Sequence, residues 1–219
     1  LSMRTYLAID LGAESGRAIL GTLDEGKLSL EELHRFPNVP VRTPSGLYWD
    51  TLRLFGDMQQ GLAVAGRERK LRLDGVGVDT WGVDFGLIGR DGSLVASPMH
   101  YRDSRNDGIL EKMFAVVPRE EIFAHTGVQF MELNTLCQLY AMKLAGSPGL
   151  EAADRLLMMP DLFNYWLAGV KRNELTDAST TQFYNPVKKR WATELLDRLG
   201  IPARLLGEIV FPGALLGPV

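Results

Sequence analysis

An acid, a glycine loop and a base lie within eight residues of one another near the start of the chain. Asp10 ends one apolar run, Gly12 and Gly16 bracket a short polar loop, and Arg17 begins a second apolar run. A carboxylate at a strand end can hold a hydrated Mg²⁺, and the backbone N–H groups of a glycine-rich loop can face phosphoryl oxygens. Arginine adds a planar donor that is permanently charged. The combination predicts a phosphate-binding site, because phosphoryl transfer depends mostly on positioning and charge stabilisation.

Two familiar phosphate loops do not fit this stretch. The Walker loop requires a lysine and a following helix, and neither is present. The dinucleotide fingerprint also requires a helix after the loop, whereas RAILGTL indicates a strand. A strand–loop–strand hairpin remains, in which the Ser15 hydroxyl joins the loop N–H groups. The alternative is a hairpin that needs glycine only for its backbone angles, with Asp10 and Arg17 as a surface pair.

Three strands are expected to hold this loop. The runs at 5–10, 17–24 and 27–36 are separated by short turns, the second of them at Glu25 and Gly26, which predicts an antiparallel meander. Residues 37–49 contain three prolines and are expected to form a loop.

A helix and two more strands follow the meander. Asp50 is a suitable cap for a helix within 51–70, which carries an apolar stripe. The small, β-branched run at 75–79 is typical of a buried parallel strand, and 83–95 predicts another strand with a turn at 90–92. The order of elements favours an α/β or α+β fold with one mixed sheet.

Helical patterns dominate the remainder of the chain. We expect helices within 106–117, 118–127 and 189–200. Two others have clear boundaries: one starts at a cap, Asn134, and stops at Gly146, and another starts at Pro160 and stops at Gly169.

The composition excludes several classes of function. Of 219 residues, 46% are hydrophobic and 23% are charged, and the net charge is −3. No basic block stands out, so neither nucleic-acid nor membrane-surface binding is expected. No apolar stretch is long enough to span a bilayer, and no signal peptide is visible. Cys137 is the only cysteine, which fits a reducing cytoplasm. The three histidines are far apart in the sequence and predict no transition-metal site, and no G-x-S-x-G elbow suggests a serine hydrolase.

Six motifs together resemble the FGGY family of carbohydrate kinases. DLGAESGR at 10–17 is similar to the first phosphate loop of that family. The other five, in order, most resemble its L-rhamnulose-phosphorylating branch: GVDTWGVDF (77–85), YRDSRN (101–106), TGVQFMELNTLCQL (126–139), LLMMPDLFNYWLAG (156–169) and ELTDASTTQFYN (174–185). The resemblance covers essentially the whole chain. It implies an α/β fold of the actin-like ATPase or ribonuclease-H-like type, with a mixed central sheet flanked by helices.

The resemblance also implies ligands and the residues that contact them. ATP and Mg²⁺ are the expected cofactors and L-rhamnulose or a similar ketose the expected substrate, phosphorylated to L-rhamnulose 1-phosphate. The cofactor side would comprise Asp10, which is also the metal ligand, with Gly12, Ala13, Glu14, Ser15, Gly16 and Arg17. Gly82 would lie at the sugar, where a side chain would crowd the ligand.

Further sugar-side candidates follow from position as well as from the resemblance. Asp79 and Thr80 end a strand and can bind hydroxyl groups, and Trp81 can offer an apolar face to a sugar ring. The alternative is a core tryptophan beside an aspartate that caps a turn. Asp84 is considered for the same site. Arg102 can reach a polar group near the sugar, although a solvated salt-bridge loop explains most of its charged neighbours.

Two departures from the family pattern matter. Glu14 stands where the family usually has a small residue, and since an acid would repel a triphosphate we expect its side chain to point outward. The catalytic aspartate and the adenosine-binding motifs of the family have no counterpart here. We therefore expect residues 1–219 to be the N-terminal domain alone, inactive without its C-terminal domain. The alternatives are a non-catalytic sugar-binding or regulatory module, or a related kinase for another ketose or polyol.

Overall fold

The computed structural model describes residues 2–219, which form two compact units. The first unit comprises the chain up to Val41, Asp50–Trp81 and Pro218–Val219. The second comprises Arg42–Trp49 and Gly82–Gly217. The predicted sugar-side residues are therefore divided, because the boundary falls between Trp81 and Gly82.

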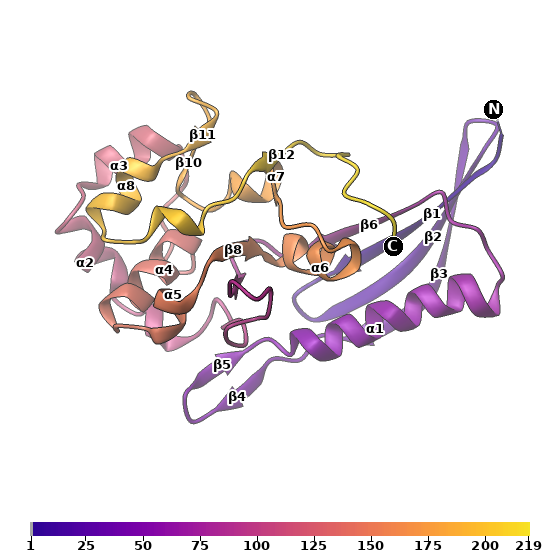
Figure 1. Ribbon diagram of the computed structural model, residues 1–219, viewed down its shortest axis with the longest axis horizontal. Coiled ribbons are helices and arrows are strands. Elements are labelled where there is room, and N and C mark those ends of the chain that lie inside the picture. Colours follow the sequence, from indigo (N-terminus) through magenta and orange to yellow (C-terminus); the bar gives the residue numbers. More distant parts are fainter. Residues whose placement is uncertain (1) are drawn as a thin grey trace. The chain divides into compact units, whose positions relative to one another are not determined.

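A four-stranded mixed sheet forms the first unit, in the order β3-β2-β1-β6 (Figure 1). Strands β1 (Arg4–Leu11), β2 (Ser15–Asp24) and β3 (Lys27–Pro37) are antiparallel, while β6 (Gly75–Thr80) runs parallel to β1. The predicted meander and the parallel direction of β6 are confirmed. The expectation that this strand is buried is wrong, because β6 is at the edge of the sheet and each of its residues is partly or fully exposed. Glu25 has a φ of 47° and Gly26 a φ of 79°. Positive angles at both positions are what a tight hairpin turn between right-twisted strands requires.

Helix α1 (Thr51–Ala63) covers one face of this sheet. Leu7, Ile9 and Leu11 alternate along β1 and are buried, as a half-buried strand requires. The helix begins as predicted, since the Asp50 side chain accepts a hydrogen bond from the Arg53 N–H at 3.2 Å. It continues into a π-helical turn, η1 (Val64–Glu68). A Cβ on Gly61 would lie 2.6 Å from the Ala18 Cβ, so glycine permits the close approach of helix and sheet.

The second unit contains several short strands that were not predicted from the sequence. Residues predicted as a loop form a small hairpin of β4 (Val41–Thr43) and β5 (Gly46–Tyr48). The strand expected within 83–95 is the shorter β7 (Phe85–Ile88), which pairs antiparallel with β8 (Arg155–Met158) rather than with the main sheet. Two more two-stranded pairs are β9 (Asn173–Glu174) with β12 (Ile209–Val210), and β10 (Tyr184–Asn185) with β11 (Arg190–Trp191).

Helices make up most of the second unit. They are α2 (Ile109–Phe114), α3 (Arg119–Thr126), α4 (Thr135–Leu144), α5 (Pro148–Ala152), α6 (Met159–Ala168), α7 (Leu175–Ala178) and α8 (Thr193–Arg198), with short turns η2 (Ser104–Asn106) and η3 (Ala203–Leu205). Their apolar faces form one buried cluster around Leu136 and Phe183. Among residues 2–219, no helix has the length and apolar character needed to cross a membrane.

Most predicted helix boundaries are confirmed, with two corrections. Gly146, after α4, has a φ of 60°, and Gly169, after α6, has a φ of 72°. Such angles are typical of glycines that end helices. Asn134 occupies the cap position of α4, but its side chain donates to the Gln129 carbonyl instead of capping the helix. The helix expected within 189–200 begins only at Thr193, because the two residues of β11 pair with β10.

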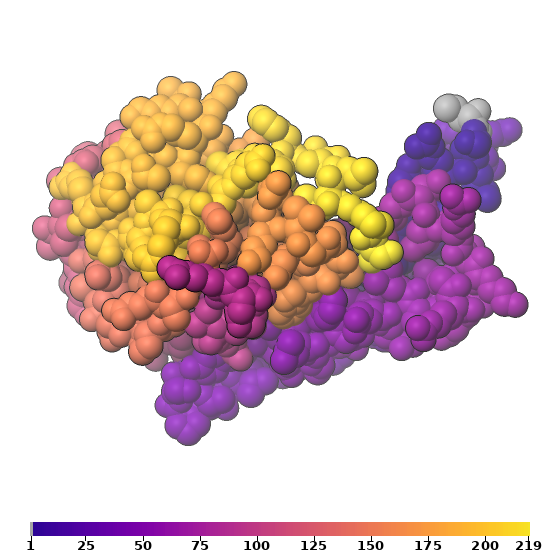
Figure 2. Space-filling view, viewed as in Figure 1, coloured from indigo at the N-terminus to yellow at the C-terminus, as the bar shows by residue number. Residues whose placement is uncertain are grey.

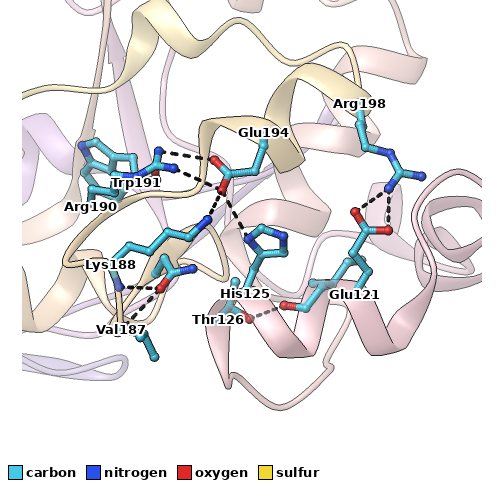
Figure 3. Close-up of polar contacts among 11 residues, drawn as sticks. Glu121, His125, Thr126, Val187, Lys188, Arg190, Trp191, Glu194 and Arg198 are labelled. Carbon is cyan, nitrogen blue, oxygen red and sulfur yellow. Dashed lines mark hydrogen bonds and ion pairs between the residues drawn. The ribbon is translucent and has the colours of Figure 1, made fainter.

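Surface ion pairs tie α3 to α8 (Figure 3). Glu194 lies 3.3 Å from Lys188 Nζ, 3.4 Å from Arg190 Nη2 and 3.5 Å from His125 Nδ1. Arg198 pairs with Glu121 of α3. Hydrogen bonding to its own backbone N–H, more than these cations, lowers the pKa of Glu194. The pairs are largely in solvent, so they contribute little to stability.

The loop after β7 packs on α6, as Figure 2 shows for the magenta and orange surfaces of the second unit. Gly92 ends the predicted turn at 90–92 with a φ of 85°. Its carbonyl accepts a hydrogen bond from the Tyr165 hydroxyl at 3.0 Å, and a Cβ on Gly92 would lie 2.7 Å from that hydroxyl oxygen. The turn therefore requires glycine for both its conformation and its contact with the helix.

Candidate functional site

The predicted acid and base of the first hairpin are brought together by strand register. Asp10 of β1 lies opposite Arg17 of β2. The Arg17 Nε donates to Asp10 Oδ2 at 2.8 Å, and Arg17 Nη2 lies 2.8 Å from the same oxygen. The arginine side chain is 39% exposed and the aspartate side chain 35%. Solvent therefore weakens the pair, and either partner can exchange it for another ligand.

A second carboxylate joins this end of the sheet from the parallel strand. The register of β1 and β6 pairs Asp10 with Asp79, so both residues lie on the same face as Arg17. Asp79 is exposed, and Thr80 and Trp81 are half-buried. The Thr80 hydroxyl donates to the Trp81 carbonyl at 2.8 Å. The structure thus gathers Asp10, Arg17 and Asp79 on one face, with Thr80 and Trp81 at the end of β6.

Asn38, which was not predicted from the sequence, holds the loop between β1 and β2. Its side-chain amide donates to the Gly12 carbonyl at 2.9 Å, and its backbone N–H donates to the Glu14 carbonyl at 2.9 Å. Gly12 N–H also donates across the loop to the Ser15 carbonyl at 2.9 Å. Asn38 is only 3% exposed, and it lies far along the chain, directly after β3. The Glu14 side chain is exposed.

The two loop glycines do not have left-handed backbone conformations. Neither Gly12 nor Gly16 has a positive φ, although the pair of Asp10 and Arg17 that the alternative expected is present. A Cβ on Gly16 would lie 2.3 Å from a ring carbon of Phe36 and 2.7 Å from Leu11 Cδ2. Packing against Phe36 therefore accounts for glycine at position 16.

The residues at this end of the sheet suit a magnesium ion that also contacts phosphates. Mg²⁺ usually takes one or two carboxylates, several waters and phosphate oxygens rather than a complete protein cage. Asp10, the predicted metal ligand, supplies one carboxylate, and the carboxylate of Asp79 belongs to the adjacent strand. Among residues 2–219 no group of three His, Cys, Asp or Glu side chains could hold a metal ion, so a fully protein-built metal centre is not formed by the described residues.

In the second unit, the residues after Gly82 lead into a buried polar network. Asp84 is completely buried, and its Oδ2 accepts hydrogen bonds from Trp49 Nε1 at 2.5 Å and the Tyr101 N–H at 3.2 Å. Its Oδ1 accepts from Gln138 Nε2 at 2.8 Å, and Gln138 Oε1 accepts from Arg105 Nη2 at 2.6 Å. The structure therefore places Asp84, considered above for the sugar site, inside the protein as a hub of structural hydrogen bonds.

Two arginines of the YRDSRN motif have opposite placements. Arg102, the predicted sugar contact, is exposed, and its guanidinium lies 5.5 Å from the centre of the Tyr101 ring. Arg105, which was predicted to lie in a solvated salt-bridge loop, points inward, and burial lowers the pKa of its guanidinium. Its Nε and Nη1 are buried without a hydrogen-bond partner among the described residues. The D-x-R spacing was a sequence signal for the inward position of Arg105. The Asp103 carboxylate accepts a hydrogen bond from the Arg105 N–H at 3.0 Å, which orients the turn.

Three other titratable groups of the second unit are buried. Burial raises the pKa of Cys137 to about 12, which keeps its thiol protonated and unreactive. Burial also raises the pKa of Asp161 to about 8, despite hydrogen bonds from the Glu174 N–H and Asn173 Nδ2.

His100 lies beside the Asp84 network. Burial and the nearby Arg102 charge lower the pKa of His100 to about 4, and its ring stacks on Trp49 with 4.1 Å between centroids.

Comparison with known proteins connects the whole chain to one family. The N-terminal domain of the FGGY family of carbohydrate kinases matches residues 5–219. The rhamnulokinase of Bacteroides thetaiotaomicron is 41% identical over 214 residues, which is 98% of this chain and 44% of that protein. The rhamnulokinase of Pectobacterium atrosepticum is 42% identical over 219 residues, 99% of this chain and 44% of that protein. The chain thus spans less than half the length of these curated relatives.

Solved structures with little sequence similarity share the fold. Gluconate kinase from Lactobacillus acidophilus superposes with a TM-score of 0.85 at 17% identity, over 99% of this chain and 44% of that one. Plasmodium falciparum glycerol kinase, solved with ADP, gives a TM-score of 0.80 at 15% identity, over 98% of this chain and 44% of that one. The expected actin-like α/β architecture is confirmed. The family match over nearly every residue shows that the chain belongs to the FGGY family of carbohydrate kinases, through the N-terminal domain of that family.

Proposed function

We propose that residues 1–219 are the N-terminal half of an ATP-dependent kinase that phosphorylates L-rhamnulose to L-rhamnulose 1-phosphate. The observation that carries this proposal is the identity of 41% and 42% to two rhamnulokinases along 98% and 99% of the chain. The whole protein would also contain a C-terminal domain, and it would act in the cytoplasm, where ATP is available.

In this proposal the first hairpin binds the phosphate groups. The N–H groups of Ala13, Glu14 and Ser15 and the Ser15 hydroxyl face phosphoryl oxygens between Gly12 and Gly16. The Asn38 hydrogen bonds support this role, because they hold the loop backbone in one conformation before any ligand arrives. Arg17 and Asp10 are paired with each other in the structure. With ligands bound, Arg17 would donate to phosphate oxygens and Asp10 would hold Mg²⁺. Mg²⁺, when bound, neutralises charge on the phosphates.

The acceptor sugar is assigned to the residues that end β6 and follow it. Asp79 and Thr80 offer hydroxyl-binding groups, Trp81 an apolar surface, and Arg102 a charged donor. Gly82 supports the assignment in a different way. Its φ is not positive, and a Cβ there would meet only Asp177 Oδ1 at 3.4 Å and Thr180 Oγ1 at 3.6 Å, which are ordinary contacts. Nothing in residues 2–219 therefore demands glycine at this position, whereas a bound sugar would.

No residue of the chain is assigned as the catalytic base. A kinase of this kind needs a group that removes the proton from the attacking sugar hydroxyl. We assign that base and the adenosine pocket to the C-terminal domain, and we expect the 219-residue chain alone to show negligible phosphorylation.

The test compares the 219-residue chain with the full-length protein in an assay of ADP release over a panel of ketoses and polyols. We expect turnover with L-rhamnulose by the full-length protein only. Comparable turnover by the chain alone would refute the division into halves. Turnover with another ketose would reassign the acceptor. Sugar binding without ADP release in the full-length protein would favour a non-catalytic module.

An arginine substitution in the full-length protein tests the role of the hairpin. Arg17→Met should lower kcat by about 100-fold, the typical loss when a charged group that stabilises the transition state is removed. The sugar KM should change little. Arg69→Met is the matched control, because Arg69 also belongs to the first unit and forms an exposed ion pair, with Glu31. A raised sugar KM with kcat retained would show that the hairpin had been assigned to the wrong ligand.

A further inference from the structure

Val83 has a backbone conformation that its side chain disfavours. Its φ is 69°. This angle lies in the left-handed region, where a β-branched residue is a genuine outlier. Val83 directly follows Gly82 and precedes the buried Asp84. Strained residues of this kind persist only where the surrounding structure holds them in place, and they concentrate at functional sites.

Two side chains at the start of α4 hold the Val83 carbonyl. The Thr135 hydroxyl donates to Val83 O at 2.8 Å, and Gln138 Nε2 lies 3.2 Å from the same oxygen. Thr135 and Gln138 are both completely buried. Thr135 supplies the closer donor to this oxygen. Gln138 shares the two N–H groups of its amide among Val83 O, Asp84 Oδ1 at 2.8 Å and Leu133 O at 2.9 Å. Both side chains come from residues more than fifty positions along the chain.

Gln138 is itself fixed by charged groups on both sides of its amide. Its Oε1 faces the Arg105 guanidinium and its Nε2 faces the Asp84 carboxylate. A cation beside the carbonyl end and an anion beside the amino end select one orientation of the amide group. The same side chain therefore connects the buried Arg105–Asp84 network to the carbonyl of the strained residue.

We propose that Thr135 and Gln138 are positioning residues that hold Val83 in its left-handed conformation and so fix the Gly82–Val83 turn where the acceptor sugar binds. This inference rests on the proposed function, specifically on Gly82 as a sugar contact. The donors do not touch the sugar in this proposal. They act on it through the backbone of the turn.

Isosteric variants of the full-length protein test the proposal. Thr135→Val removes the hydroxyl donor while preserving shape, and Thr135→Ser keeps the donor. We expect Thr135→Val to raise amide hydrogen exchange of the 80–85 peptide and to raise the sugar KM by about tenfold, the effect of losing roughly one hydrogen bond. The ATP KM should stay unchanged, and Thr135→Ser should resemble wild type. A variant that merely unfolds more easily would lower the apparent kcat and leave both KM values alone.

A change at Val83 itself separates the turn from other roles of Gln138. Gln138→Met should also raise the sugar KM, with Gln60→Met on the exposed surface of α1 as the matched control. Glycine adopts positive φ angles without strain, so Val83→Gly should reduce the rise in sugar KM that Gln138→Met causes.

An equal rise in sugar KM with and without Val83→Gly would overturn the proposal. So would unchanged hydrogen exchange in Thr135→Val, or raised exchange with an unchanged sugar KM. A wild-type protein that phosphorylates no ketose would refute the proposed function, while the hydrogen-exchange comparison would still test the turn.

Discussion

Two regions contain similar charged residues in opposite environments: the end of the β-sheet that carries Asp10 and Arg17, here called the sheet end, and the polar network around Asp84 in the second unit. At the sheet end, Asp10 and Arg17 are each more than a third exposed and bond mainly to each other. In the network, Asp84 is completely buried and accepts hydrogen bonds from Trp49, Tyr101 and Gln138. Arg105 is connected to it through Gln138.

The difference shows how burial divides ligand binding from structural support. An exposed carboxylate and guanidinium are already hydrated, so exchanging their mutual contact for a metal ion or a phosphate costs little. A buried carboxylate must have its hydrogen bonds supplied by the protein, because a desolvated charge without partners is strongly unfavourable. The sheet end therefore suits exchangeable ligands, and the network suits holding the turn at Val83.

The largest effect should follow from removing the buried carboxylate. Asp84→Ala should lower the free energy of unfolding of the second unit by about 3–5 kcal/mol, because it leaves the buried donors of Trp49 and Gln138 without their acceptor and removes one of the carboxylates near Arg105. Urea denaturation followed by circular dichroism would measure the loss. Asp10→Ala is the matched control and should cost about 1 kcal/mol or less, as exposed pairs do. Equal losses for the two variants would contradict the contrast between the regions.

A glycine of the first hairpin should give an intermediate effect. Gly16→Ala forces a methyl group against the Phe36 ring. We therefore expect a loss of about 1–3 kcal/mol from overpacking. Gly77→Ala on β6 is the control, because a Cβ there meets nothing within 4 Å. The thermal midpoint of each variant would be measured. If Gly16→Ala proved as stable as Gly77→Ala, the packing explanation would fail and ligand contact alone would have to account for the glycine.

The smallest effect on stability should come from the exposed base. Arg17→Met should change the free energy of unfolding by about 1 kcal/mol or less, and added salt should shrink the difference further. Chemical denaturation at low and high salt is the measurement. A loss above about 2 kcal/mol that persists at high salt would contradict this prediction. It would mean that the Asp10–Arg17 pair stabilises the fold, as the charged groups of the buried network do.

Local chemistry predicted the elements that depend on neighbouring residues. The Glu25–Gly26 turn, the Asp50 cap and the stop at Gly169 each follow from the backbone preferences of one or two residues. The apolar run before the glycine loop predicted a strand at 5–10, and β1 spans Arg4–Leu11 with Leu7 and Ile9 buried. These signals lie within a few residues of the feature that they specify, so a single sequence reveals them.

Two predictions failed because the local signal was ambiguous, and one contact was missed because its partners are distant in sequence. Residues 37–49 were predicted as a loop, but β4 and β5 within them form a hairpin with Pro44 in its turn. Asn134 has the right residue type for a cap, but a carbonyl five residues earlier competes for its side chain. Asn38 gave no local signal at all, since its partners lie 24 and 26 residues earlier in the chain.

Taken alone, the sequence determined the strand–loop–strand hairpin with its acid and base, because the order of residue types and the turn preferences are local properties. It also carried the family resemblance through motifs in a set order. Only the tertiary structure decided which charged residues are exposed and which are buried. Arg102 and Arg105 are three residues apart in one motif, yet one lies on the surface and the other donates to Gln138. Burial arises from the packing of segments distant in sequence, so residue type and spacing cannot specify it.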